Sequence, residues 1–405
     1  MLTRKVAGIT GRMRMYSQLV KAVARLKRIE TGRTIALITH ELTSSGSSLL
    51  LMNLCDYYCK KGYKVVILTE NTQPAAKEIQ ESLQKAYAVL RLNYRRSTRM
   101  RALHALYKAG VRCAIGNTVL AGTFAQELNA VGIRSTFLIH EMWASLNILD
   151  AREIARQIIQ YGDKVLFPSQ IVRDSFFEYA GMDCDEKKIS ILPQGCRAEF
   201  KPGLSRAEAR TALRSRFSLE TNARILVGAG AINFGKGMDM CLPVLKKLAM
   251  KEDGAPFYML WAGAINQKDP YFLWLQVQIR ALQLEDRIHF LGFISDAARY
   301  AEVLMGGDVF YLSSREDSFP SVLIEAACAQ IPALAYEGSG GGADYITQHR
   351  TGLCVPMGDV DAACHAILEM CETPELYANE ATKTRAEKKF AFSEYAEHIL
   401  KLTKV

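Results

Sequence analysis

The sequence lacks closely spaced cysteine pairs. It contains ten cysteines, but no two of them form a CxxC pair. Zinc sites and redox-active dithiols commonly use such pairs, so the spacing indicates neither. We therefore expect reduced thiols that are mostly buried.

The sequence also lacks long apolar runs. The longest candidates, such as residues 49–54, are far shorter than the roughly 20 residues that cross a bilayer. Near the N-terminus, Arg12, Arg14, Lys21 and Arg25 interrupt every stretch that would serve as the apolar block of a secretory signal. These absences predict a cytoplasmic protein.

Acidic residues are scarce in the first part of the chain. Residues 1–112 contain 21 Lys and Arg against six Asp and Glu, a net charge of +15, whereas the whole chain carries +9. The remainder is therefore net acidic, and the first part should prefer anionic surfaces. No known nucleic-acid-binding motif accompanies this charge, so a nucleic-acid partner is not expected.

Residues 13–30 have the pattern of an amphipathic helix. Its apolar stripe consists of Tyr16, Leu19, Val20, Val23 and Leu26, and its basic stripe of Arg14, Lys21, Arg25 and Arg28. A second basic stretch spans residues 91–101. One interpretation is docking on an anionic membrane surface, where each basic residue contributes about 1 kcal/mol. The other is a helix that packs against its own domain with solvated charges.

The chain does contain a regular alternation of short β-rich runs and longer helical periods, which is typical of parallel sheets with helical crossovers. The first series of expected strands comprises residues 34–39, 64–69, 113–117, 135–140, 164–169 and 189–193. The second comprises residues 224–230, 256–263, 287–292, 308–314, 332–336 and 352–356. In a chain of 405 residues, two α/β series predict two doubly wound, Rossmann-like domains.

A turn-rich segment over residues 193–203 separates the two series. We place an N-terminal domain at residues 1–197 and a C-terminal domain at residues 198–383. Residues 384–405 form a helical pattern without a following strand, which we expect to cross back to the N-terminal domain. Ligands of open parallel sheets bind beyond the carboxyl ends of the strands, so candidate chemistry should directly follow the strands.

The residues after the expected strand 308–314 are the most informative. In SSREDSFPSVLIEAA, residues 313–327, Pro320 fits the first position of a helix. The backbone N–H groups at the start of that helix would form an anion site suited to a phosphate. These donors belong to Ser321, Val322 and Leu323.

Two carboxylates flank this expected phosphate site. Asp317 lies in the loop before the helix, and Glu325 lies about 7.5 Å along the helix with its side chain leaning back toward the start. Beside a phosphate they would accept hydrogen bonds from neighbouring hydroxyls, such as those of a ribose and a sugar. This combination describes a nucleotide diphosphosugar. The alternative is that both acids only cap the helix and compensate its dipole.

Asp317, seven intervening residues and Glu325 resemble the acid-x7-acid signature of retaining nucleotide-sugar glycosyltransferases of the GT-B fold (glycosyltransferase family 4-like). Similarity extends along most of the chain, through HELTSSG (40–46), IHE (139–141), LPQG (192–195), the Lys-Gly pair at 236–237 and EGSGGGADYI (337–346). The resemblance implies two Rossmann-like domains that face each other across a cleft. The donor would bind mainly in the second domain and the acceptor in the first.

The resemblance also assigns roles to residues around the signature. Glu325 would hold the ribose hydroxyls, and Asp317 would act as a catalytic residue at the hydroxyls of the transferred sugar. The helix start, with Phe319, Ser321 and Val322, would line the donor. Glu316 would be a bystander.

Lys236 is the residue that the resemblance assigns to the donor diphosphate, where it would stabilise the leaving nucleotide. The sequence departs from its relatives here, because they usually carry an Arg a few residues earlier and residues 231–235 are neutral. Arg224 begins its strand, roughly 20 Å away. We therefore expect Arg315 to share the phosphate charge. Without the motif, Lys236 would be an ordinary solvated lysine.

The remaining donor contacts come from three other loops. The resemblance places His140 at the donor sugar, Gly46 at the phosphates or sugar, and Phe293 and Ile294 beside the base. Glu141 would position the acceptor. A structural role is the alternative for His140, and apolar packing is the alternative for Phe293 and Ile294.

Three other patterns carry less weight. The Gly228-Ala-Gly230 run is similar to a dinucleotide-binding loop, but Asn233 replaces its third glycine. The DxD strings at 183–185 and 359–361 are expected to cap turns and helices, and no metal is predicted. The glycine-rich loop 338–342 either lets backbone approach the donor or forms a flexible turn.

Taken with the resemblance, the sequence predicts a retaining, hexosyltransferase-like and metal-independent glycosyltransferase without a cofactor. It would move a sugar from a nucleotide diphosphosugar to a glycan or lipid-linked acceptor in polysaccharide or glycolipid biosynthesis, in the cytoplasm or peripherally on the cytoplasmic face of a membrane. Two rival hypotheses are a dinucleotide-dependent Rossmann oxidoreductase and a non-catalytic membrane-binding scaffold. The residues do not specify the base, the sugar or the acceptor.

Overall fold

The computed structural model describes residues 17, 19–21, 23–24, 33–43, 45–93, 95–195, 203–251 and 254–404. The chain divides into two compact units. Unit 1 contains Met1–Pro193 and Ser393–Val405, and unit 2 contains Gln194–Phe392. Most of the expected amphipathic helix 13–30, including Tyr16, Leu26 and three of its arginines, lies outside the described residues.

Unit 1 is built on a seven-stranded parallel sheet with the order β3-β2-β1-β4-β5-β6-β7. Its strands are β1 (Thr34–Thr39), β2 (Lys64–Thr69), β3 (Ala88–Arg91), β4 (Cys113–Asn117), β5 (Arg134–Leu138), β6 (Lys164–Phe167) and β7 (Ile189–Ile191). All six strands predicted for this part are present. The seventh, β3, was missed because it is a four-residue edge strand in which only Leu90 is buried.

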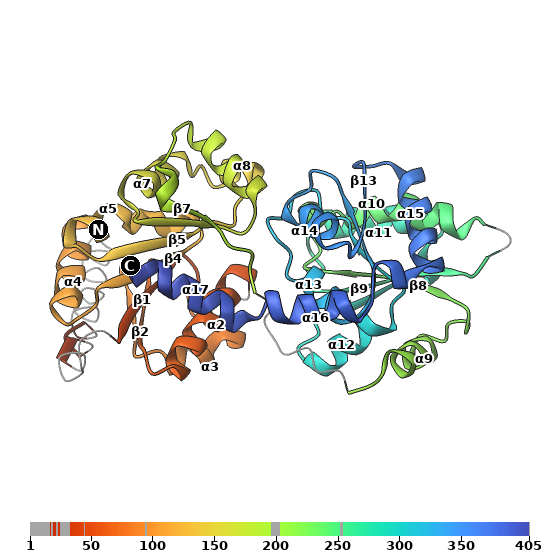
Figure 1. Cartoon of the computed structure of the whole chain (residues 1–405), viewed down its shortest axis with the longest axis horizontal. Coiled ribbons are helices and arrows are strands. Elements are labelled where there is room, and N and C mark those ends of the chain that lie inside the picture. Colours follow the sequence, from red (N-terminus) through yellow and green to blue (C-terminus); the bar gives the residue numbers. More distant parts are fainter. Residues whose placement is uncertain are drawn as a thin grey trace. The chain divides into compact units, whose positions relative to one another are not determined.

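Helices cover both faces of this sheet (Figure 1). They are α2 (Gly46–Lys60), α3 (Lys77–Lys85), α4 (Arg96–Lys108), α5 (Ala125–Val131), α6 (Trp143–Ile148), α7 (Arg152–Tyr161), α8 (Gln170–Ala180) and α17 (Phe392–Lys404). Leu106, Leu128, Ile158 and Phe176 from α4, α5, α7 and α8 share one core cluster with Ile38 of β1. The central strands β1, β2 and β4 are buried on both faces, as expected of a parallel sheet.

The last helix, α17, is an integral part of unit 1. Tyr58 on α2 donates a buried hydrogen bond to the carbonyl oxygen of Ala396 at 2.9 Å. Thr403 Oγ1 donates to Thr136 Oγ1 on β5 at 2.9 Å. Ile399 is fully buried between these contacts. The chain thus returns to unit 1 at Ser393, after α16 (Glu380–Lys389) has ended in unit 2.

Unit 2 is built on a six-stranded parallel sheet with the order β10-β9-β8-β11-β12-β13. Its strands are β8 (Arg224–Ala229), β9 (Phe257–Ala262), β10 (Ile288–Gly292), β11 (Val309–Leu312), β12 (Ala333–Tyr336) and β13 (Gly352–Val355). Each corresponds to one of the predicted strands. The prediction of two doubly wound α/β domains is therefore confirmed.

Two core clusters lie on opposite faces of this sheet (Figure 1). One is formed with α10 (Met238–Ala249), α11 (Pro270–Ala281) and α15 (Val360–Glu372). The other is formed with α9 (Arg206–Arg216), α12 (Ala297–Gly306), α13 (Val322–Cys328), α14 (Gly341–His349) and α16. None of the described helices combines the length and the apolarity needed to cross a bilayer.

We predict that Ile399→Ala destabilises unit 1 by about 2–5 kcal/mol, because it removes a fully buried side chain and leaves a cavity. Hydrogen–deuterium exchange under increasing urea should show faster opening of β4 and β5, with unit 2 unchanged. The matched control is Ile148→Ala, whose side chain is 84% exposed and should change stability by less than about 0.5 kcal/mol. Equal effects of the two substitutions would contradict a structural role of α17 in unit 1.

Candidate functional site

The carboxyl ends of β8 and β11 bring Lys236 and Asp317 together in unit 2. Lys236 lies on η3 (Phe234–Lys236), the turn after β8, and Asp317 lies in the loop after β11. The Lys236 ammonium forms an ion pair with Oδ2 of Asp317. Ser314 donates a hydrogen bond to the same oxygen at 3.2 Å. The Asp317 side chain is only 11% exposed, so this is a largely desolvated charge pair.

Gly237 allows η3 to approach the end of β11. Its φ of +62° is in the left-handed region, and a Cβ there would lie 2.2 Å from the carbonyl oxygen of Ser313. Ser313 in turn donates its hydroxyl to the carbonyl oxygen of Lys236 at 2.9 Å. The ion pair therefore rests on a close backbone contact that only glycine permits.

The glycine-rich loop after β12 braces Asp317 from the other side. The backbone N–H of Asp317 donates to the carbonyl oxygen of Ser339 at 2.7 Å, and that of Gly341 donates to Ser318 at 3.1 Å. Gly340 has a φ of +139°, and a Cβ there would lie 1.7 Å from the carbonyl oxygen of Asp317. The loop therefore positions Asp317, which argues against a flexible turn. An approach of its backbone to the donor stays a prediction.

Helix α13 begins later than predicted. Its first residue is Val322, with Ser321 as N-cap, so the placement of Pro320 at the first helical position was wrong. The N–H of Leu323 donates to the carbonyl oxygen of Pro320 at 3.1 Å, which removes one of the three expected phosphate donors. Glu325 is half-buried and lies within the first turn of this shorter helix. It is therefore closer to the helix start than the sequence suggested.

Arg315 is held by a partner that the sequence analysis missed. Its guanidinium binds both carboxylate oxygens of Asp239 on α10, at 2.9 and 2.6 Å. It also lies 4.0 Å from the centre of the Phe234 ring. Tyr271 donates a hydrogen bond to Asp239 at 2.6 Å. Burial opposes ionisation of Asp239, but the hydrogen bonds from Arg315 and Tyr271 outweigh burial and lower its pKa.

The three predicted apolar donor contacts differ in their surroundings. The Phe319 side chain is buried against Tyr345 and Phe390, so only its backbone remains available for a donor contact. Phe293 is 61% exposed just after β10 and does not pack in the core. Ile294 packs partly against the core cluster that contains α13. The apolar-packing alternative thus applies to Ile294 but not to Phe293.

In unit 1, a chain of hydrogen bonds links His140 to the loop that carries Gly46. The Nε2 atom of His140 lies 3.1 Å from Oδ1 of the buried Asn117, at the end of β4. Asn117 donates through Nδ2 to the carbonyl oxygen of Ser47 at 2.8 Å. Gly46 is the first residue of α2, and a Cβ there would meet no atom within 4 Å. The backbone at Gly46 is therefore open to an approaching group.

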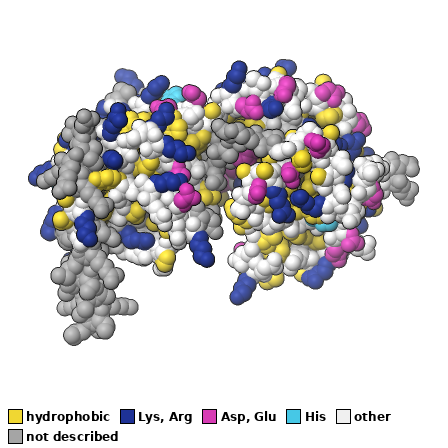
Figure 2. All heavy atoms as spheres, turned by 90° about the horizontal axis from the view of Figure 1, so that it is seen from below, with side chains coloured by type: hydrophobic (Ala, Val, Ile, Leu, Met, Phe, Trp, Pro, Cys, Tyr) yellow, Lys and Arg dark blue, Asp and Glu magenta, His cyan; other side chains and the backbone are white. Residues whose placement is uncertain are grey.

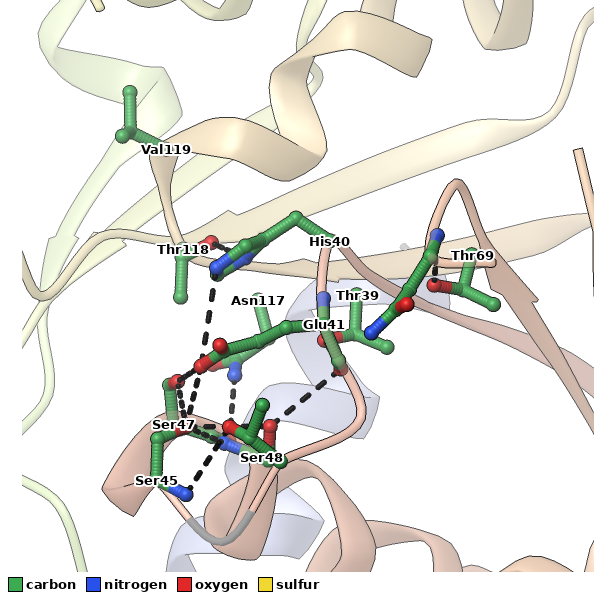
Figure 3. Close-up of polar contacts among 12 residues, drawn as sticks. Thr39, His40, Glu41, Ser45, Ser47, Ser48, Thr69, Asn117, Thr118 and Val119 are labelled. Atoms are coloured by element: carbon green, nitrogen blue, oxygen red, sulfur yellow. Dashed lines mark hydrogen bonds and ion pairs between the residues drawn. The ribbon is translucent and has the colours of Figure 1, made fainter. Parts of the chain in front are cut away.

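A second polar cluster surrounds the end of β1 (Figure 3). Ser45 and Ser47 both donate to Oε1 of Glu41, and Thr118 lies 2.9 Å from Nδ1 of His40. Thr118 has a φ of +77°, which is a strained conformation for a β-branched residue. His40 and Glu41, within HELTSSG, were not predicted as site residues. Their position directly after β1 was the signal left unused.

Glu141 and His140 both have strongly shifted pKa values. The Glu141 carboxylate accepts hydrogen bonds from the N–H groups of Val119 and His140, each at 3.1 Å. Burial nevertheless raises the pKa of Glu141 to about 7. Burial lowers the pKa of His140 to about 4. Near neutral pH, His140 is therefore a neutral imidazole and Glu141 can exchange a proton.

The DxD strings have the capping roles predicted for them. Asp185 accepts a hydrogen bond from the N–H of Lys187 at 3.0 Å. Asp359 is the N-cap of α15 and accepts from the N–H of Ala362 at 2.9 Å. Asp361 forms an ion pair with Lys247.

Comparisons with known proteins relate the chain to glycosyltransferases. The family model of glycosyl transferases group 1 matches residues 209–387, within unit 2. A GDP-mannose-dependent alpha-(1-6)-phosphatidylinositol monomannoside mannosyltransferase from Mycobacterium tuberculosis is 26% identical over 275 residues, which are 66% of this chain and 63% of that protein. The chain thus spans less than two thirds of the length of this relative.

Solved structures with low sequence identity share the fold. Anabaena Alr3699/HepE in complex with UDP has a TM-score of 0.74 and 14% identity, covering 91% of this chain and 99% of that one. Sucrose-phosphate synthase from Thermosynechococcus elongatus has a TM-score of 0.72 and 18% identity, covering 92% and 98%. The predicted resemblance to GT-B glycosyltransferases is confirmed.

Gly340→Ala should lower the free energy of unfolding of unit 2 by more than Gly338→Ala does. Both glycines have positive φ, so each alanine costs roughly 1–2 kcal/mol of backbone strain. Only Gly340 adds a clash with the Asp317 carbonyl, whereas a Cβ at Gly338 meets no atom within 4 Å. Urea unfolding of both variants measures the difference. Equal losses would show that the contact of Gly340 with Asp317 is not close.

Removing Glu141 should change the pH dependence of stability in a defined direction. Folded Glu141 keeps its proton up to about pH 7, against an ordinary value of 4.5. The contribution of this group to the free energy of unfolding is therefore complete below pH 4.5 and is lost as the pH rises toward 7. Relative to wild type, Glu141→Gln should gain stability over this interval. Relative to wild type, His140→Asn should lose stability as the pH rises from about 4 to 6.5. Urea unfolding across this pH range tests both, and differences that stay constant with pH would contradict both shifts.

Proposed function

We propose that this chain, whose unit 2 matches the glycosyl transferase group 1 family, transfers a sugar from a nucleotide diphosphosugar to a glycan or lipid-linked acceptor. The proposal includes retention of configuration at the sugar and no requirement for a metal. The observation that carries it is the ion pair of Lys236 with Asp317 at the carboxyl ends of β8 and β11, within the matched segment. This is where an open α/β sheet binds its ligand.

Donor binding would exchange the partners of this ion pair. A diphosphate offers Lys236 more negative charge than one carboxylate does, so Lys236 would move from Asp317 to the diphosphate. Asp317 would then be free to accept hydrogen bonds from hydroxyls of the sugar. Glu325, in the first turn of α13, would hold the ribose hydroxyls, with Ser321 and Val322 at the phosphates and Phe293 beside the base. Lys236 would stabilise the nucleotide as negative charge develops on it.

The acceptor proton needs no separate general base in this scheme. The departing phosphate would take the proton of the attacking hydroxyl on the same face of the sugar, which accounts for retention. In unit 1, His140 would contact the donor sugar as a neutral imidazole, because burial lowers its pKa to about 4. Glu141 and Glu41 would bind the acceptor.

A lipid-linked acceptor is supported by the relative from M. tuberculosis, whose name describes a phosphatidylinositol mannoside as its acceptor. The basic stretch 91–101 supplies part of an anionic-membrane contact on unit 1. Arg95, Arg96 and Arg101 are exposed there. Arg99 instead binds Glu70 and Glu127, so not every arginine of the stretch is available. Peripheral docking on the cytoplasmic face would bring such an acceptor to unit 1.

The rival hypotheses have less support. A dinucleotide-dependent oxidoreductase needs the third glycine that Asn233 replaces, and Asn233 instead caps η3 by accepting from the N–H of Lys236 at 3.0 Å. The hypothesis of a non-catalytic scaffold does not explain why a largely buried Lys–Asp pair lies at the end of the sheet.

Asp317→Asn should lower the rate of sugar transfer by at least about 100-fold, whereas the affinity for the nucleotide diphosphate should be kept or increased. Binding is kept because the substitution releases Lys236 from its competing carboxylate. Transfer is measured by nucleotide release from a panel of UDP-, GDP- and ADP-sugars, and binding by calorimetry with the nucleotide diphosphates. Glu316→Gln, one residue away, is the control and should retain activity. Full transfer activity in Asp317→Asn would refute the assigned role.

A further inference from the structure

A cavity of about 260 Å³ lies in unit 2 at the amino ends of the strands. Lys236 and Asp317 lie at the opposite, carboxyl ends of the same sheet. Its lining includes Arg206, Arg210, Arg224, Asp308, Met370 and Cys371. No step of the proposed transfer reaction uses it. The cavity lies within one unit, so its shape does not depend on the placement of the other.

Three arginines reach this region from one face of α9. Arg206, Arg210 and Arg214 are spaced four residues apart, so they lie on the same side of the helix. A capping box between Ser205 and Glu208 fixes the start of α9. Figure 2 shows the face of unit 2 that carries α9 and α12, with basic side chains grouped among apolar ones.

Both carboxylate oxygens of Asp308 already have partners. Its Oδ1 atom pairs with Arg210 at 2.6 Å and with Arg224 at 3.7 Å. Its Oδ2 atom accepts from Arg214 at 2.9 Å and from the N–H of Ile225 at 2.8 Å. Asp308 is 3% exposed, so this carboxylate is a structural anchor that ties α9 to β8 and β11.

Positive charge therefore exceeds negative charge in the lining of the cavity, where three arginines accompany one aspartate. In the described part of the chain, no ion pair within 4 Å joins Arg206 to a carboxylate. Arg206 is half-buried, and burial together with the neighbouring Arg210 lowers its pKa to about 10. It remains charged near neutral pH, in a place where an anion would relieve both the desolvation and the repulsion.

The opposite wall of the cavity is uncharged. Met370 and Cys371 come from the end of α15. Burial raises the pKa of Cys371 to about 12, so its thiol stays neutral. The volume is slightly below the roughly 300 Å³ at which pockets for drug-sized ligands begin, which suits a small ligand with one strongly anionic group.

We propose that this cavity binds the phosphate group of a small phosphate monoester, with Arg206, Arg210 and Arg224 as its donors. Guanidinium groups present paired N–H donors that match phosphate oxygens, and Met370 and Cys371 would contact the organic part of the ester. The site is distinct from the proposed donor site. Arg224 begins β8 and Lys236 follows its end, so the two sites are roughly 20 Å apart along the strand.

The test is calorimetric titration of the full chain with glycerol 3-phosphate and with inorganic phosphate at constant ionic strength. Arg206→Gln should weaken binding of glycerol 3-phosphate by at least about tenfold, because it removes charge-assisted hydrogen bonds without breaking an ion pair of the protein. Arg224→Gln, a second variant, should have the same effect. Hydrogen–deuterium exchange should show ligand-induced protection of α9 and the end of α15.

Two controls separate this site from its alternatives. Arg216→Gln removes a charge from α9 that lies 3.8 Å from Glu302, and should leave the affinity unchanged. Lys236→Ala should also leave it unchanged, because that residue belongs to the proposed nucleotide site. Binding that is lost in Lys236→Ala but kept in Arg206→Gln and Arg224→Gln would overturn the proposal without affecting the proposed function.

The source of the phosphate group is tested separately. Vesicles of phosphatidylcholine with phosphatidate present the same phosphate monoester on a lipid. Arg206-dependent binding to these vesicles, without binding of glycerol 3-phosphate, would overturn the assignment to a free small molecule. Binding of glycerol 3-phosphate that Arg206→Gln and Arg224→Gln both leave unchanged would overturn the site itself.

Discussion

The ion pair between Lys236 and Asp317 is the interaction on which the candidate site depends. The two residues are 81 positions apart in the sequence and meet because β8 and β11 are neighbours in the sheet. A largely buried pair costs desolvation free energy that only close and well-supported geometry offsets. Gly237 and Gly340 supply that geometry by letting the backbone after β8 and after β12 touch the backbone after β11. The pair is thus a property of three adjacent strands and not of one motif.

The same sheet is held at its other end by a second ion cluster. Asp308 precedes β11 and binds Arg210 and Arg214 of α9, together with the backbone of β8. The central strands β8 and β11 are therefore fixed by charge at both ends, with an apolar core between them. Movement of α9 would be transmitted to these strands through Asp308. A ligand that binds the arginines would stabilise this arrangement by mass action in proportion to its occupancy.

Strands were the part of the fold that the sequence specified most clearly. Buried parallel strands form short continuous apolar runs bounded by turn residues, and each run that was predicted as a strand proved to be one. The exception was β3, whose Ala, Val, Leu and Arg form neither a long run nor an alternation. Helix starts were less well specified. Pro320 is compatible with the first helical position, but the bridge between Asp317 and Gly340 holds the preceding chain in an extended form and delays the helix to Val322.

Within the candidate site, several residues predicted from the sequence lie close together in the structure, but their partners were not predicted. Lys236 and Asp317 were each predicted from a local motif, yet their pairing depends on strand order, which a local motif does not contain. Arg315 was expected at a phosphate because it is basic and near the loop. The structure pairs it with Asp239 on α10, 76 residues earlier in the sequence, which no spacing rule connects to it. The arginines of α9 were not predicted as a site for the same reason, because their partner Asp308 is about a hundred residues away from them in the sequence.

Several proposed ligand-binding groups are held by other groups of the protein. Lys236 is held by Asp317, Arg315 by Asp239, and Glu41 by Ser45 and Ser47. Binding at these positions is an exchange of partners, so its free energy is the difference between two sets of hydrogen bonds and ion pairs. Such exchange favours a ligand that satisfies all the released groups at once. In the proposed donor site, a ligand that binds Lys236 but offers no hydroxyl to Asp317 would leave a largely buried carboxylate unpaired. That cost would favour an intact nucleotide sugar over a nucleotide alone.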